Sequence, residues 1–336
     1  MKEYKFGSNP LKVYGLPGYN ESGIPERLPK RIRELIPSLE TLGRRCPGGR
    51  IRFRTNSKHI TFKMELETLT RDIGMSLRGC QALNVYIGEG RAARFAGLVF
   101  PPDYDTKQCE ATFEKSDSME SVTVFLPRNE PIKDISILVD DEASVLAPIA
   151  YKYPIPVLYY GSSITEGGCP ANLTNAYNTI ISRRLDADFI NFGFSGGAKG
   201  EPEMADYINE IEKSILVIDY DHNAPSVEHL QKTHEPFFMR IRSHSPNLPI
   251  VIISAPDFDF LKHGAERRDI IKQTYLNARA RGDENVYFID GETLLGTRDR
   301  DMCLTDGCHP NDLGFYRMAD AIEPTIKMLL EKSVRQ

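Results

Sequence analysis

Val157-Leu158-Tyr159-Tyr160-Gly161-Ser162-Ser163 joins a short apolar run to a small polar turn. The residues of the run do not alternate between apolar and polar, which is typical of a strand covered on both faces, as parallel strands are. Four further runs of this kind follow in the C-terminal half: Phe189-Ile190-Asn191-Phe192, Ile215-Leu216-Val217-Ile218, Ile250-Val251-Ile252-Ile253 and Val286-Tyr287-Phe288-Ile289. Together the five runs predict a five-stranded parallel sheet.

Helix-like stretches lie between these runs and after the last one. They cover approximately residues 174–186, 201–213, 226–243, 264–281 and 312–332. Strands that alternate with helices predict a doubly wound α/β domain, whose ligands bind beyond the carboxyl ends of the strands. We therefore expect the functional residues in loops that directly follow strands.

The N-terminal half has a different pattern. Between residues 50 and 145, apolar and polar residues alternate in several short segments, among them Ile60-Thr61-Phe62-Lys63-Met64 and Val122-Thr123-Val124. Period-two alternation indicates strands with one packed face and one face toward solvent. Several such strands without a convincing helix among them predict an antiparallel β-sandwich. We expect residues 1–150 to form this accessory domain and residues 151–336 to form the α/β domain.

The composition excludes several classes of protein. The chain has 42 Lys and Arg against 47 Asp and Glu, so its net charge of -5 gives no general reason to expect a nucleic acid partner. No apolar run approaches the roughly 18 residues that cross a bilayer, and residues 1–15 lack the basic start and apolar middle of a secretory signal. We therefore expect a cytoplasmic protein without a membrane or nucleic acid partner.

Charged residues and cysteines give little sign of a metal site. The six cysteines are too sparse for a disulfide scaffold and include no CxxC pair of the kind that binds zinc. Asp219, Asp221 and His222 are close in sequence, but in an extended chain His222 points away from the face shared by the two carboxylates. We predict neither a metal nor an organic cofactor.

Residues 27–54 hold nine Arg or Lys, for which a solvated surface is the favoured interpretation and an anion-binding patch the alternative.

Two loops of the C-terminal half carry residues for nucleophilic catalysis. Gly161-Ser162-Ser163 forms a strand-to-helix turn that can project a serine hydroxyl over the sheet edge. Asp306-Gly307-Cys308-His309 places a carboxylate three residues before a histidine. Attack by serine needs a base, and the base needs a carboxylate that orients its ring. Ser163, His309 and Asp306 are therefore candidates for nucleophile, base and orienting acid.

Two other loops after strands carry candidate hydrogen-bond donors. Asn191-Phe192-Gly193-Phe194-Ser195-Gly196 follows the second strand, and Asp219-Tyr220-Asp221-His222-Asn223 follows the third. Acyl transfer develops negative charge on a carbonyl oxygen, which a backbone N–H at a glycine and an asparagine amide can stabilise. Taken singly, each of these segments is more often an ordinary loop between a strand and a helix.

The four loops together resemble the SGNH, or GDSL-type, hydrolase superfamily of esterases and acylhydrolases. Ser163 matches the nucleophile, Gly196 and Asn223 match the two donors, and Asp306 and His309 match the Asp-x-x-His pair. The resemblance covers residues 154–332 and implies a flavodoxin-like α/β fold, a catalytic triad, and an oxyanion hole formed by Ser163, Gly196 and Asn223. The chain departs from the family pattern in two places: Gly161-Ser162-Ser163 replaces Gly-Asp-Ser, and Asn223 lies in Asp-x-Asn-Ala.

The N-terminal half is similar to the jelly-roll-like β-sandwich that precedes the SGNH domain in some bacterial carbohydrate esterases. Segments such as Ile73-Gly74-Met75-Ser76-Leu77 carry this fainter likeness. The two resemblances together imply a serine esterase that hydrolyses O-acyl esters, most simply O-acetyl, on a carbohydrate, with a small-molecule or oligosaccharide ester as its substrate. Two alternatives stay open: an acyltransferase that uses the same site, and a carbohydrate-binding protein without catalysis.

Overall fold

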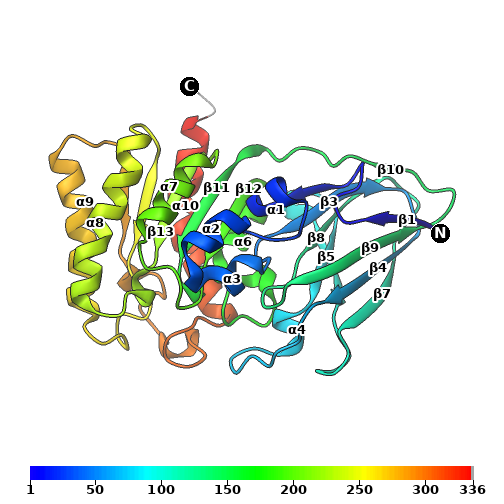
Figure 1. The fold of residues 1–336 in the computed structure, drawn as a ribbon, viewed down its shortest axis with the longest axis horizontal. Helices are drawn as coiled ribbons and strands as arrows, with labels where there is room; N and C mark the ends of the chain where they lie inside the picture. The colour runs from blue at the N-terminus through cyan, green and yellow to red at the C-terminus, as the bar shows by residue number, and fades with distance from the viewer. Residues whose placement is uncertain (334–336) are drawn as a thin grey trace.

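The computed structural model describes residues 1–333, and their C-terminal half contains the predicted five-stranded parallel sheet (Figure 1). The strand order is β12-β11-β13-β14-β15, and every neighbouring pair is parallel. This is the flavodoxin-like order, so the predicted fold class is confirmed. The strands are β11 (Tyr153–Gly161), β12 (Ala187–Gly193), β13 (Ile215–Asp219), β14 (Ile250–Ile253) and β15 (Val286–Ile289).

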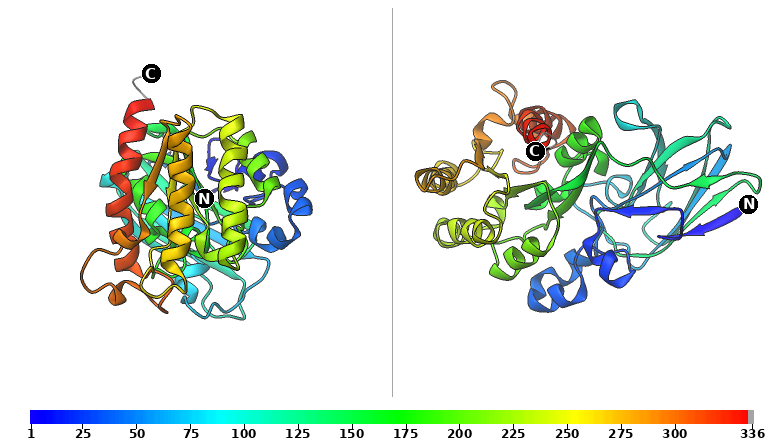
Figure 2. Two further views of the ribbon diagram at one scale, coloured as in Figure 1. Left: turned by 90° about the vertical axis from the view of Figure 1, so that its left-hand side faces the viewer. Right: turned by 90° about the horizontal axis from the view of Figure 1, so that it is seen from above.

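Both faces of this sheet are buried, which explains why its strands read as unbroken apolar runs. Leu158 packs in the core on one face with residues of three helices, α7, α8 and α9. Its neighbour Val157 packs in the core on the other face with residues of α6 and α10. The two views of Figure 2 show these helices on either side of the sheet. Their bounds are α6 (Tyr177–Leu185), α7 (Pro202–Glu210), α8 (Val227–His244), α9 (Gly264–Ala280) and α10 (Asp312–Ser333), close to the predicted ranges.

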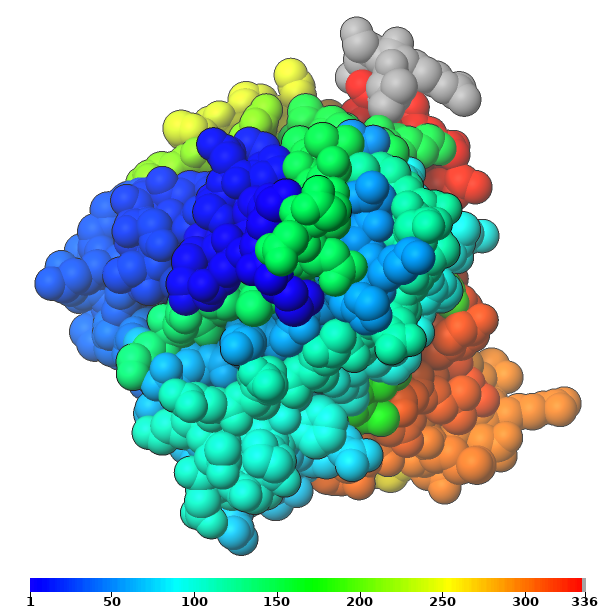
Figure 3. All heavy atoms as spheres, turned by 90° about the vertical axis from the view of Figure 1, so that its right-hand side faces the viewer, coloured from blue at the N-terminus to red at the C-terminus, as the bar shows by residue number. Residues whose placement is uncertain are grey.

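The N-terminal half contains two antiparallel sheets, as the alternating pattern predicts. Phe62 of one sheet and Phe53 of the other are fully buried in the same apolar core. The first sheet has the order β1 (Lys2–Lys5), β9 (Ile132–Val139), β4 (His59–Leu66) and β7 (Gln108–Glu114). The second has the order β10 (Val145–Leu146), β3 (Arg50–Thr55), β8 (Glu120–Phe125), β5 (Leu83–Ile87) and β6 (Arg94–Val99), with β2 (Lys12–Tyr14) also paired to β3. Figure 3 views the molecule from this end.

Short helices of the first 45 residues lie between the two halves. They are α1 (Pro17–Ser22), α2 (Lys30–Leu35) and α3 (Glu40–Arg44), and a fourth short helix, α4 (Leu77–Cys80), precedes β5. Tyr19 of α1 packs against the sandwich core, whereas α2 and the residues that follow it pack against the α/β half. Ile32 and Leu39 are buried in the same core as Met204 of α7. Figure 1 shows these blue helices beside the green α/β sheet. The first 45 residues therefore join the two halves.

The basic stretch 27–54 is not simply a solvated surface, which corrects the favoured interpretation. Four of its nine cationic side chains are buried, and three of these form ion pairs with carboxylates. Arg50, for example, pairs with Asp188 at the start of β12. Removing a cation from water is costly, and a carboxylate partner offsets part of that cost. The four are Arg27, Arg33, Arg50 and Arg52.

A membrane-spanning helix would need a long apolar stretch. Within residues 1–333, no helix has the length and apolar character to cross a membrane.

Candidate active site

Ser163 lies at the point where β11 turns into the four-residue helix α5 (Ser163–Glu166). The Ser162 hydroxyl caps this helix by accepting a hydrogen bond from the N–H of Ile164 at 3.2 Å. The turn needs a glycine at position 161, because a Cβ there would lie 2.1 Å from Thr165 Oγ1 and 2.3 Å from the carbonyl oxygen of Asp219. The local sequence therefore holds the serine at the carboxyl edge of the sheet, as expected for an α/β site.

The structure brings Ser163 and His309 together, although they are 146 positions apart in the chain. Ser163 Oγ lies 2.8 Å from His309 Nε2, and His309 Nδ1 lies 2.8 Å from Asp306 Oδ2. The other carboxylate oxygen, Asp306 Oδ1, accepts the N–H groups of Cys308 at 3.0 Å and His309 at 2.8 Å. A hydroxyl, an imidazole and a carboxylate are thus linked in the order that serine hydrolases use.

The electrostatics of this cluster keep Asp306 ionised. Partial burial by itself raises the pKa of Asp306, but hydrogen bonds from the backbone and ring of His309 and from the N–H of Cys308 outweigh it and lower the pKa below its usual value. A carboxylate can hold the imidazole in one orientation and stabilise its protonated form.

The candidate oxyanion donors Gly196 and Asn223 contact each other, and this contact differs from expectation. The N–H of Gly196 already donates to Asn223 Oδ1 at 3.0 Å, and Asn223 Nδ2 donates to the carbonyl oxygen of Phe194 at 2.8 Å. The N–H of Gly196 can therefore stabilise an oxyanion only if it is shared between the oxyanion and Asn223 Oδ1. Among the described residues, the second hydrogen on Asn223 Nδ2 and the N–H of Ser163 have no hydrogen-bond partner.

A buried carboxylate that the sequence did not single out lies three residues after the serine. Glu166 is fully buried and forms ion pairs with two arginines of the N-terminal half, Arg27 at 3.2 Å and Arg128 at 3.4 Å. Burial by itself raises the pKa of Glu166, but Arg128 and Arg27 outweigh it, so the pKa is lowered and the group is ionised. No local pattern reveals this cluster, because its members come from three distant segments.

The same cluster reaches the loop that carries Gly196. Glu166 Oε2 accepts the N–H of Ser195 at 3.1 Å, and Arg128 Nη2 donates to the Ser195 hydroxyl at 3.2 Å. The N-terminal half is therefore in direct contact with the residue that precedes a candidate oxyanion donor.

Asp219, Asp221 and His222 face three different sets of partners. Asp219 accepts hydrogen bonds from the hydroxyls of Thr165 at 2.9 Å and Tyr177 at 3.2 Å. Asp221 pairs with Arg267 at 2.8 Å, in the short turn Asp221–Asn223. His222 turns toward two other residues, Asp257 and Cys308, which the sequence did not associate with it. The three therefore do not share one cation position.

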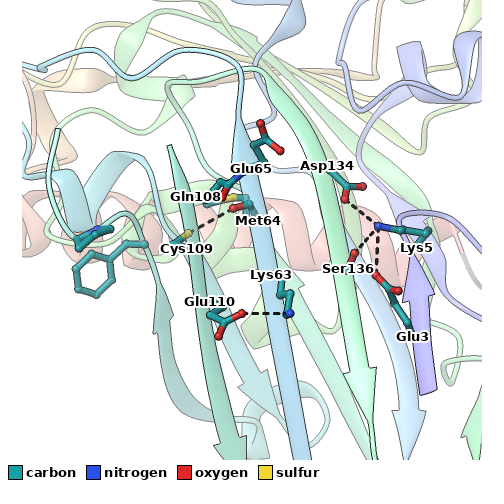
Figure 4. A pocket seen from close by; sticks show the side chains of 12 residues that line it. Glu3, Lys5, Lys63, Met64, Glu65, Gln108, Cys109, Glu110, Asp134 and Ser136 are labelled. Atoms are coloured by element: carbon teal, nitrogen blue, oxygen red, sulfur yellow. Dashed lines mark hydrogen bonds and ion pairs between the residues drawn. The ribbon is translucent and has the colours of Figure 1, made fainter. Parts of the chain in front are cut away.

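The outer face of the first sandwich sheet has a hollow of about 620 Å³, shown in Figure 4. Its charged side chains pair with one another, as Lys63 does with Glu110 at 3.3 Å and Lys5 with Asp134 at 2.9 Å. None of the five predicted site residues lines it. The chemistry of the four loops is therefore separate from this hollow.

Comparisons with known proteins agree with the fold. Residues 154–327 match the GDSL-like lipase/acylhydrolase family, and residues 6–145 match the N-terminus of SGNH-hydrolase-type esterases. No curated protein matches the chain.

Three solved structures share the architecture of both halves. A Bacteroides ovatus protein named as a GDSL-like lipase is 25% identical, with a TM-score of 0.88 and 98% of each chain covered. A salicylyl-acyltransferase from a tetracycline biosynthetic pathway is 17% identical, with a TM-score of 0.78 and coverage of 98% of this chain and 97% of that one. An acetyl xylan esterase from the rumen bacterium Butyrivibrio proteoclasticus is 12% identical, with a TM-score of 0.60 and coverage of 98% and 100%. The chain belongs to the GDSL-like lipase/acylhydrolase family, and it is a carboxylic ester hydrolase.

Proposed function

We propose that the protein is a serine esterase that removes O-acetyl groups from an oligosaccharide through an acyl-enzyme. The observation that carries the proposal is the hydrogen-bonded chain from Ser163 Oγ through His309 to Asp306, with 2.8 Å at each link. This distance lies within hydrogen-bond reach, as transfer of the serine proton to the imidazole requires.

In the first step, His309 Nε2 takes the proton of Ser163 as Oγ attacks the ester carbonyl. The oxyanion is stabilised by the N–H of Ser163, by the free hydrogen of Asn223 Nδ2 and by the shared N–H of Gly196. His309 then protonates the departing alcohol, and the acyl group remains on Ser163. In the second step, His309 activates a water that releases the acid. Asp306 orients His309 throughout.

Two observations support a carbohydrate as the substrate. Arg128 of the N-terminal half contacts Ser195, the residue before a candidate oxyanion donor, which supports a role of that half in binding the substrate. An acetyl xylan esterase has the same two-part architecture over the whole of its length. The division into an accessory domain of residues 1–150 and a catalytic domain of residues 151–336 is part of this proposal.

An acyltransferase is the second candidate. The salicylyl-acyltransferase matches this fold with a higher TM-score than the acetyl xylan esterase does. An alcohol in place of water in the second step would convert hydrolysis into transfer on the same residues. The third possibility, carbohydrate binding without catalysis, gives no role to the hydrogen-bonded triad.

The test is a panel of nitrophenyl esters from acetyl to longer acyl groups, followed by acetylated oligosaccharides, each with the wild type and with Ser163→Ala. We expect fastest turnover with acetyl and acetate release from the oligosaccharides, both lost in Ser163→Ala. Near-wild-type activity in that variant would refute the nucleophile. Added alcohols that divert the acyl group from water would favour the acyltransferase.

A further inference from the structure

Cys308 lies between the catalytic-loop residue His309 and a second histidine, His222. Cys308 Sγ is 3.8 Å from His222 Nδ1, and His222 Nε2 is 2.6 Å from Asp257 Oδ1. A thiol, an imidazole and a carboxylate therefore stand in the order of nucleophile, base and orienting acid. The triad of Ser163 uses none of these three side chains.

The surroundings of His222 favour its protonated form. Burial by itself lowers the pKa of His222, but the carboxylate of Asp257 and the contact with Cys308 outweigh it and raise the pKa well above its usual value. A protonated imidazole beside a sulfur stabilises the thiolate, which is the reactive form of cysteine.

The other five thiols have surroundings of the opposite kind. None of them has a histidine as a hydrogen-bond partner within residues 1–333. Burial raises their pKa values, to about 12 for Cys46, Cys80 and Cys109, to about 11 for Cys169, and above the usual value for Cys303. Their thiolates are therefore scarce at neutral pH.

Cys308 itself is partly exposed to solvent, so a reagent can reach its sulfur. Its neighbour His222 also lines a cavity of about 410 Å³ together with Pro225, Val227 and Leu261, although Cys308 does not line that cavity.

We propose that Cys308 is a covalent modification site, at which a small disulfide forms a mixed disulfide and thereby blocks the neighbouring Ser163–His309–Asp306 site. The new bond joins Cys308 Sγ to one sulfur of the reagent, and the bond that breaks is the reagent's own S–S bond. The leaving thiolate takes up the proton that Cys308 gave to His222. One disulfide is consumed for each one formed, so the reaction needs no other oxidant.

The modification affects catalysis because Cys308 lies in the same loop as Asp306 and His309. The N–H of Cys308 donates to Asp306 Oδ1 at 3.0 Å, and His309 is the next residue. A group added to Sγ must displace this loop or occupy the space between His222 and His309. The effect on turnover rests on the proposed function, whereas the reactivity of Cys308 does not.

The experiment treats the full chain with glutathione disulfide in the presence of a chelator, and follows intact mass, peptide mapping and hydrolysis of nitrophenyl acetate. We expect one glutathione per chain, mapped to Cys308, with loss of turnover that dithiothreitol reverses. Cys308→Ser should take up no glutathione, and its turnover should be the same before and after treatment with glutathione disulfide. The matched control Cys169→Ser should behave as the wild type.

Two further variants test the role of the second histidine. His222→Gln removes the imidazole that accepts the Cys308 proton, so it should slow labelling by at least about tenfold. Asp257→Asn keeps the imidazole and should slow labelling in the same direction.

Three results would overturn the proposal: adducts spread over several cysteines, loss of turnover in treated Cys308→Ser, or a fully labelled Cys308 with unchanged turnover. Labelling of Ser163→Ala separates this proposal from the esterase proposal. That variant should take up glutathione at Cys308 whether or not the wild type hydrolyses esters.

Discussion

Arg27 Nη2 lies 3.2 Å from Glu166 Oε1, and both side chains are fully buried although 139 positions separate them. The Arg27 guanidinium also donates to carbonyl oxygens of both halves: Nη1 donates to Asn191 at 3.0 Å, and Nη2 itself donates to Leu42 at 2.7 Å. This contact fixes the short helix of Ser163 to the segment that joins β2 and β3 of the sandwich. Arg27 of the N-terminal half therefore helps to hold the helix that begins at the candidate nucleophile in place.

Glu166→Gln should destabilise the protein strongly. The change leaves the buried cation of Arg27 without its carboxylate and leaves Arg128 with Asp72 alone, and breaking a buried ion pair typically costs about 3–5 kcal/mol. Urea unfolding measures the difference in the free energy of unfolding. The control is Glu21→Gln, whose partner Arg31 is exposed and also pairs with Glu210, and it should lose no more than about 1 kcal/mol. Equal losses in the two variants would contradict the role of the buried cluster.

Asn223→Ala should lower kcat about 10²–10³-fold, the usual cost of losing one oxyanion donor. The substitution also removes the acceptor of the Gly196 N–H and so loosens the second donor. Steady-state kinetics with nitrophenyl acetate measure the effect, and Asn20→Ala, on the exposed end of α1, is the control. A kcat within about twofold of the wild type would exclude Asn223 from the oxyanion hole.

Asp306→Asn should lower kcat by about 10⁴-fold, because a neutral amide no longer favours the productive tautomer of the imidazole. KM should change little, since Asp306 contacts His309 rather than the substrate. The exposed Asp301→Asn, five residues earlier, serves as the control. An active Asp306→Asn would show that another carboxylate orients His309.

Asp219 should make stability fall as pH rises. Burial raises the pKa of Asp219 to about 7, whereas the pKa of an aspartate in an unfolded chain is about 4. Between these values the folded protein holds a proton that the unfolded chain has released, so its free energy of unfolding decreases with rising pH and levels off above about 7.

Urea unfolding of Asp219→Asn across this pH range tests the assignment. The neutral amide removes the titration, so the dependence on pH should flatten relative to the wild type. Asp105→Asn, an exposed position, should leave the dependence unchanged. The same slope in wild type and Asp219→Asn would assign the proton to another group.

The sequence by itself determined the α/β sheet and the positions of the candidate triad in it. Buried parallel strands have apolar residues on both faces, so runs such as Val157-Leu158-Tyr159-Tyr160 reveal them locally. Once the strands are known, the loops after them must lie at one edge of the sheet, which places Ser163, Gly196 and Asn223 close together. The roles of these residues and of His309 and Asp306 stay predictions.

Only the tertiary structure decided the contacts between distant segments. It placed Arg27 and Arg128 on Glu166, turned His222 toward Asp257 and Cys308, and gave the Gly196 N–H a partner in Asn223. Periodicity reports whether a residue is buried, but it does not report which charged partner compensates that burial, because the partner is chosen by packing between segments far apart in the chain. The sequence therefore predicted a solvated surface for the basic stretch 27–54, whereas four of its cationic side chains are buried in the folded protein.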